Sequence, residues 1–170
     1  MQIERKQCQS TAELIDFFKK LQDSPAQVVQ LFSARPEAEN KKIISAFNCY
    51  LPFSTLMGVS AEEVIFENQV KLKQLTAVAL RFEKSSFRLL RTELSSRENA
   101  RKIMEVVGPD TKAIIIFSDD RYNNGDNLID ELNKYNSELI IAGGQAGRAE
   151  ENEAGYIFDK AGLIKKGSLA

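Results

Sequence analysis

The feature that most constrains the fold is a pattern that occurs twice along the chain. An apolar strand ending in Leu31-Phe32-Ser33 is matched by a later strand ending in Ile116-Phe117-Ser118. Each is followed by a segment with helical spacing of apolar residues and then by a second strand, which ends at Gly58 or at Gly143. The spacing is equal in the two copies, because 117 − 32 and 143 − 58 are both 85. Strand–helix–strand units place their strands parallel, so we expect two such units.

A pair of short strands follows each unit. Val64-Ile65-Phe66-Glu67 resembles Tyr156-Ile157-Phe158-Asp159, and each begins a predicted hairpin. Here the separation is 92 residues (157 − 65), which we attribute to an inserted acidic loop with Glu150, Glu151 and Glu153. The sequence therefore predicts an α/β fold, with a mixed sheet built from two repeated strand–helix–strand–hairpin units and helices packed on it.

Further elements complete the predicted domain. Residues 1–24 carry an N-terminal helix that begins at the capping box Ser10–Glu13, and we assign it to the same domain as residues 25–170. Strands are predicted at 76–82 and 87–91, and a helix after the capping box Ser95–Glu98. The counterpart of strand 76–82 has only begun at Ser168, so we expect the second copy to be truncated at its C-terminus.

The composition excludes several kinds of chemistry. The chain has no histidine, which rules out Ser-His-Asp and Cys-His catalysis and most zinc sites. Cys8 and Cys49 have no neighbouring cysteine, so we interpret them as reduced thiols. We expect no metal and no cofactor.

The charge balance gives no sign of a polyanionic partner. Lysine and arginine number 23 and the acidic residues 24, so no basic field would attract nucleic acid or a membrane surface. The N-terminal residues lack the apolar core of a signal peptide, and no apolar run approaches the roughly 18 residues that span a bilayer. We expect a cytoplasmic protein.

The motifs at the two glycine positions resemble a known family. Gly58-Val59-Ser60-Ala61-Glu62-Glu63-Val64 and Gly143-Gly144-Gln145-Ala146-Gly147, together with the strands before them, are similar to the N-terminal FIST domain. In that family the first motif usually reads Gly-Cys-Ser/Thr-x-Gly-Glu-Ile, so Val59 replaces a cysteine and Glu62 a glycine. The resemblance implies a sensory domain for small metabolites such as amino acids, which precedes a second FIST domain or a signalling module in a longer chain.

The candidate binding residues lie where strands of the predicted sheet end, since ligands of open α/β sheets bind there. Backbone N–H groups freed by glycines would hold a carboxylate. Acidic side chains would hold an ammonium group, and an arginine would pair with a carboxylate. The candidates are Gly58, Ser60, Glu63, Asp119, Gly143, Gly144, Gln145, Gly147 and Arg148.

These residues also have simpler interpretations. The glycines would suit turns with positive φ, Asp119 and Asp120 would begin a polar turn that caps a helix, and Arg148 would be solvated.

The sequence is compatible with three functions. The first is a sensor for a small polar ligand, the second a scaffold that acts through dimerisation, and the third an enzyme that uses Asp119 with lysine or tyrosine. We favour the sensor, because the sequence lacks a clear nucleophile and base.

Overall fold

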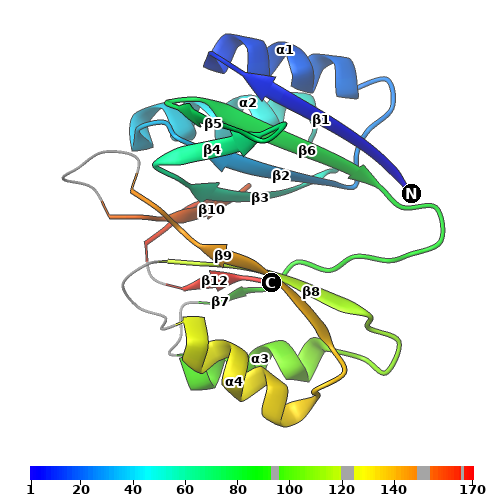
Figure 1. The fold of residues 1–170 in the computed structure, drawn as a ribbon. Coiled ribbons are helices and arrows are strands. Elements are labelled where there is room, and N and C mark those ends of the chain that lie inside the picture. The colour runs from blue at the N-terminus through cyan, green and yellow to red at the C-terminus, as the bar shows by residue number, and fades with distance from the viewer. Residues whose placement is uncertain (93–95, 120–124, 149–153, 166) are drawn as a thin grey trace.

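The computed structural model forms four layers (Figure 1). It describes residues 1–92, 96–119, 125–148, 154–165 and 167–170. Two β-sheets face each other, and a pair of helices covers the outer face of each sheet. The helices are α1 (Thr11–Leu21) and α2 (Glu37–Tyr50) on the first sheet, and α3 (Ser96–Val106) and α4 (Gly125–Tyr135) on the second. The predicted class, α/β with mixed strands and packed helices, is confirmed, and the described strands divide among these two sheets and a separate strand pair.

The first sheet has six strands, in the order β1-β6-β2-β3-β10-β11. In this sheet β2 and β3 are parallel, as the strand–helix–strand pattern predicts, and their neighbours are antiparallel to them. The strands are β1 (Gln2–Cys8), β6 (Leu75–Arg81), β2 (Val28–Ser33), β3 (Thr55–Ser60), β10 (Ile157–Asp159) and β11 (Gly162–Ile164).

The second sheet has four strands, in the order β7-β12-β8-β9. The strands are β7 (Arg91–Thr92), β12 (Ser168–Leu169), β8 (Ala113–Ser118) and β9 (Ile140–Gln145). In this sheet β8 and β9 are parallel and α4 connects them, so the predicted unit over residues 113–142 is confirmed.

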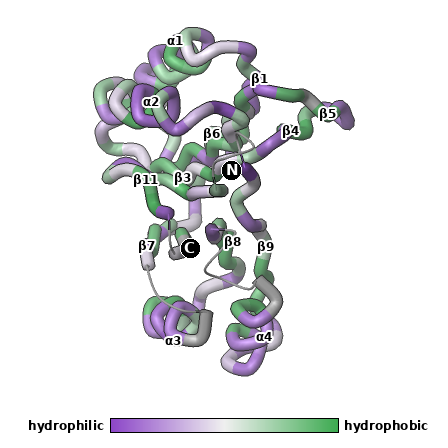
Figure 2. The backbone as a smooth tube through the Cα atoms, turned by 90° about the vertical axis from the view of Figure 1, so that its left-hand side faces the viewer, coloured by the Kyte–Doolittle hydropathy of each residue, from purple (hydrophilic) through white to green (hydrophobic). Residues whose placement is uncertain are grey.

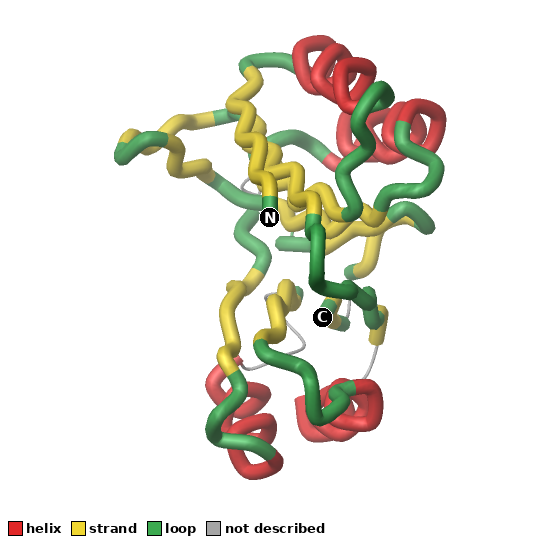
Figure 3. The backbone as a smooth tube through the Cα atoms, turned by 90° about the vertical axis from the view of Figure 1, so that its right-hand side faces the viewer, coloured by secondary structure: helices red, strands yellow, loops and turns green. Residues whose placement is uncertain are grey.

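The two parallel pairs have the same register. Leu31 lies opposite Gly58, and Ile116 lies opposite Gly143. The hairpins that follow are placed differently. The hairpin β10–β11 extends the first sheet, whereas β4 (Glu63–Phe66) and β5 (Gln69–Leu72) form a separate two-stranded sheet that projects from the body (Figures 2 and 3). Superposition of the complete units therefore stays a prediction.

Three apolar clusters fill the spaces between the layers. The first lies between the first sheet and its helices and includes Phe18 and Phe47, whose rings meet edge-on at 5.3 Å. The second lies between the two sheets, and the third between the second sheet and α3 and α4. Each sheet thus buries both of its faces over much of its area, which explains the continuous apolar runs in β2 and β8.

Two expectations about elements were wrong, and one strand was not predicted. Residues 2–8 form the edge strand β1, which the sequence analysis assigned to no element. The strand predicted at 87–91 is confined to Arg91–Thr92, and Phe87 and Leu89 instead pack on the cluster between the sheets. Gly58 and Gly143 lie inside strands rather than in turns.

The two strand glycines are required by different contacts. A Cβ at Gly58 would overlap the ring of Phe158, which lies over it. Gly143 has φ +141°, and a Cβ there would overlap the backbone carbonyl of Ile116. Glycine is required at position 58 by the close approach of a ring, and at position 143 by a backbone conformation that favours glycine. Neither glycine lies in the turn that the sequence suggested.

Candidate functional site

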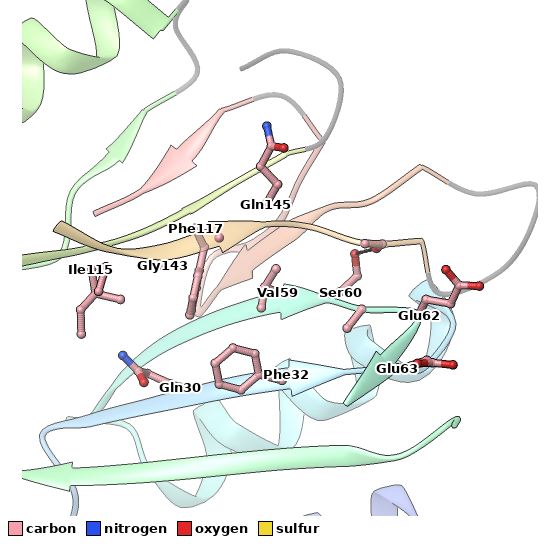
Figure 4. A pocket seen from close by; sticks show the side chains of 14 residues that line it. Gln30, Phe32, Val59, Ser60, Glu62, Glu63, Ile115, Phe117, Gly143 and Gln145 are labelled. Atoms are coloured by element: carbon pink, nitrogen blue, oxygen red, sulfur yellow. Dashed lines mark hydrogen bonds between the residues drawn. The ribbon is translucent and has the colours of Figure 1, made fainter. Parts of the chain in front are cut away.

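A cleft of about 760 Å³ opens between the two sheets (Figure 4). Its walls come from β2 and β3 on one side and from β8 and β9 on the other. The lining residues are Gln30, Phe32, Val59, Ser60, Ala61, Glu62, Glu63, Ile115, Phe117, Ala142, Gly143, Gly144, Gln145 and Gly147. Because both parallel pairs contribute, the cleft depends on the packing of one sheet against the other.

The centre of the cleft is apolar. The rings of Phe32 and Phe117 meet edge-on, with their centroids 5.5 Å apart and their planes at 74°. Val59 of β3 and Ile115 of β8 add aliphatic surface beside the two rings. An aromatic and aliphatic floor of this kind holds the apolar part of a ligand without directional bonds.

Polar groups lie around this floor. Glu62 and Glu63 are exposed at the end of the cleft where β3 ends, and Gln30 lies toward the opposite end (Figure 4). Gln145 stands on β9. None of the described lining residues is a lysine or an arginine, so the charged side chains of the lining are carboxylates. The electrostatic character of the cleft therefore favours a group with positive charge at the Glu62–Glu63 end.

Six of the nine predicted site residues line the cleft. They are Ser60, Glu63, Gly143, Gly144, Gln145 and Gly147. Their convergence follows from the topology, because β3 and β9 end side by side, where Gly147 N donates to Ser60 O at 2.8 Å. A Cβ at Gly147 would lie 3.2 Å from Glu62 N, so glycine permits this close approach.

The hydroxyl of Ser60 has a structural role at this junction. It donates to Gly147 O at 2.7 Å and accepts from Tyr156 N at 2.8 Å. The phenol of Tyr156 accepts in turn from Asn40 Nδ2 at 2.7 Å. Ser60 thus joins β3 to the segment that ends at Arg148 and to the segment that begins at Ala154, and its proton is not available to a ligand.

Three predicted residues do not line the cleft. Gly58 is covered by Phe158, and Arg148 is exposed outside the lining. Asp119 is fully buried, and its Oδ2 accepts from Gly167 N at 2.7 Å, so it secures the chain before β12. The acidic residues Asp120, Glu150, Glu151 and Glu153 lie outside the described residues.

The predicted candidates did not include Gln30, Phe32, Val59, Ile115 or Phe117, which line the cleft. Gln30, Phe32 and Val59 occupy positions whose counterparts 85 residues later are Ile115, Phe117 and Gly144, and all six line the cleft. The repeat spacing carried the necessary signal. Polar residues and glycines at strand ends do not mark these positions, because their side chains lie within the strands.

Comparison with known families decides the identity. A family model, the FIST N domain, matches residues 27–170. The chain belongs to the FIST N domain family. No curated protein and no solved structure matches it. FIST N domains are associated with sensory and signalling roles, and the resemblance noted in the two glycine motifs is confirmed.

Two further observations concern the helices of this FIST N domain and the residue types in its cleft. Within the described residues, no helix is both long and apolar enough to cross a bilayer. The lining contains neither histidine nor cysteine, and the one serine hydroxyl is engaged in backbone bonding.

Proposed function

We propose that this FIST N domain is a sensory input domain that binds a small metabolite in the cleft between its two sheets. The observation that carries the proposal is the composition of the cleft, with an aromatic floor between Phe32 and Phe117 and carboxylates at one end. Its volume of about 760 Å³ falls in the range of small-molecule sites, roughly 300–1,000 Å³.

An amino acid with an apolar side chain is the ligand class that we expect. Its side chain would lie on Phe32 and Phe117, and its ammonium group would face Glu62 and Glu63. Its carboxylate would accept hydrogen bonds from backbone N–H groups of β9 near Gly144, where glycine leaves the backbone accessible. Of the two acidic candidates for the ammonium group, Asp119 and Glu63, Glu63 lines the cleft and Asp119 does not.

The signal would pass through the spacing of the two sheets. A ligand between β2–β3 and β8–β9 contacts both, so binding favours one arrangement of the sheets over others. A signalling module or a second FIST domain in a longer chain would respond to that arrangement.

Thermal unfolding with a panel of free amino acids and amines tests the proposal. We expect a ligand at 100 times its Kd to stabilise the domain by about 2.7 kcal/mol, which raises Tm by several degrees. Gly144→Val should abolish the shift without unfolding the protein, because a Cβ at Gly144 meets no atom within 4 Å and its side chain would enter the cleft.

Gly108→Val is the matched control. A Cβ at Gly108 also meets no atom within 4 Å, and the residue lies after α3, outside the cleft lining. This variant should keep the ligand-dependent shift. The proposal fails if no compound in the panel raises Tm, or if Gly144→Val responds as Gly108→Val does.

A further inference from the structure

The strand pair β4–β5 projects from the body (Figures 2 and 3). It exposes apolar side chains. Ile65 is 73% exposed, and its cross-strand partner Val70 is 57% exposed. A two-stranded hairpin is at best marginally stable in water, and exposed β-branched residues add the cost of unburied apolar surface. Val64, on the opposite face of β4, is buried, so the hairpin packs on the body through that face while Ile65 and Val70 are left uncovered.

Strand β9 ends the second sheet. Among the described residues its one paired strand is β8, so its outer edge carries backbone groups directed away from the sheet. Five of its six residues are exposed, including Ile140 at 64%. Edge strands of this kind pair readily with another strand.

In the first sheet the corresponding edge, that of β3, is paired. The edge of β3 is covered by the hairpin β10–β11, with Ile157 opposite Val59 and Phe158 opposite Gly58. The two hairpins correspond in sequence, since Ile65-Phe66 matches Ile157-Phe158. They also share a two-residue loop, because Phe66 pairs with Gln69 and Asp159 with Gly162.

Strand β4 could pair with β9 in the register in which β10 pairs with β3. Val59 and Gly58 correspond to Gly144 and Gly143, so Ile65 would lie opposite Gly144 and Phe66 opposite Gly143. The ring of Phe66 would then cover Gly143 as the ring of Phe158 covers Gly58. The geometry permits this, because β4 begins three residues after Ser60, and Ser60 O is bonded to Gly147 N beside the end of β9.

We propose that the β4–β5 hairpin docks on the outer edge of β9 as an antiparallel strand, with Ile65 opposite Gly144. Ala61 and Glu62, which connect β3 to β4, are the hinge of this movement. Docking buries Ile65 and Val70 between the sheets and closes the side of the cleft formed by β9. The movement is a property of the chain alone and does not depend on a ligand.

Disulfide trapping in a Cys49→Ser background tests the docked arrangement. Cα atoms of directly opposed residues in antiparallel strands lie about 4.5–5.5 Å apart, within the roughly 4.4–6.8 Å that a disulfide spans. Ile65→Cys with Gly144→Cys should form a disulfide within one chain at least about tenfold faster than Val70→Cys with Gly144→Cys. In the docked form Val70 stands one strand further from β9, roughly 9–10 Å from Gly144.

Two results would overturn the proposal. One is an equal rate for the two cysteine pairs, and the other is a disulfide that forms only between two chains, which would indicate pairing with a second copy.

Hydrogen exchange of chains without introduced cysteines provides a second measurement. Ile65→Lys should raise exchange in residues 140–145 about tenfold, whereas Ile3→Lys, which changes an exposed isoleucine on the edge strand β1, should not. Equal exchange in the two variants would also refute docking.

Discussion

The parallel pairs β2–β3 and β8–β9 share a register but differ in burial. In β3 the five residues Leu56–Ser60 are buried, whereas β9 has only Ile141 partly buried and its other residues exposed. The difference comes from the neighbours. Strand β3 lies between β2 and β10, whereas β9 is the last strand in the order of its sheet. The same strand–helix–strand pattern therefore gives a core strand in one half and an accessible strand in the other.

This contrast has an energetic consequence. Removal of apolar atoms costs free energy in proportion to the area that was buried and to the cavity that remains. Equivalent substitutions in the two halves should therefore have unequal effects on the free energy of unfolding. The following predictions compare matched positions, beginning with the largest expected effect.

The largest difference is expected between Leu56→Ala and Ile141→Ala, which occupy equivalent positions in β3 and β9. Leu56 is fully buried in the first apolar cluster, so its truncation should lower the free energy of unfolding by about 3–4 kcal/mol. Ile141 is partly buried on the third cluster, and its truncation should cost about 1 kcal/mol. Urea denaturation measures both. Equal losses would show that β9 is as enclosed as β3.

The neighbouring glycines of β9 should differ by about 2–3 kcal/mol. Gly143→Ala places a side chain at φ +141° and against the carbonyl of Ile116, so it should be strongly destabilising. Gly144→Ala meets no atom within 4 Å and should change stability by less than about 1 kcal/mol. The denaturation midpoints of the two variants decide the matter, and coincident midpoints would contradict the assigned backbone conformation.

Ser60, which joins β3 to Gly147 and Tyr156, should contribute about 1–2 kcal/mol to the free energy of unfolding. Ser60→Ala removes a donor to Gly147 O and an acceptor for Tyr156 N, leaving two backbone groups without these partners. Ser54→Ala is the matched control, because its hydroxyl is buried without a hydrogen-bond partner among the described residues. The control should be neutral or slightly stabilising. A loss in Ser54→Ala as large as in Ser60→Ala would refute the bridging role.

The smallest effect concerns thiol reactivity and leaves stability unchanged. Burial raises the pKa of Cys8 to about 11, whereas Cys49 is exposed on α2. At pH 8 only roughly one Cys8 in a thousand is a thiolate, and thiolate is the reactive form. A disulfide reagent should modify one thiol per native chain and both in urea. Rapid modification of two thiols in the native protein would show that the first half is less well enclosed than described.

Much of the fold could be predicted from residue patterns, because local periodicity and spacing determine it. The runs Val28–Phe32 and Ala113–Phe117 predicted the inner strands β2 and β8, and the two hairpins followed from short apolar runs around polar turns. The strand β1 could not be predicted. Its residues Gln2–Lys6 are exposed and mostly polar, so no alternation marks them, and the strand is held by backbone pairing with β6.

The cleft could be predicted in part. Equal spacing of the two copies correctly brought Ser60 and Gly143–Gln145 together. The roles of Asp119 and Ser60 could not be predicted, because both form hydrogen bonds with backbone groups far away in sequence, at Gly167, Gly147 and Tyr156. A polar residue at the end of a strand has the same sequence pattern whether it faces a ligand or supports the chain.

The insertion of β10 beside β3 also determines the order in which the chain can fold during synthesis. Val59 pairs with Ile157, which the ribosome adds 98 residues later (157 − 59). At roughly 5–20 residues per second, β3 waits on the order of 5–20 seconds for the strand that covers it. During that interval the buried residues of β3 are next to an unpaired edge, so a chaperone that holds nascent chains should raise the yield of folded protein.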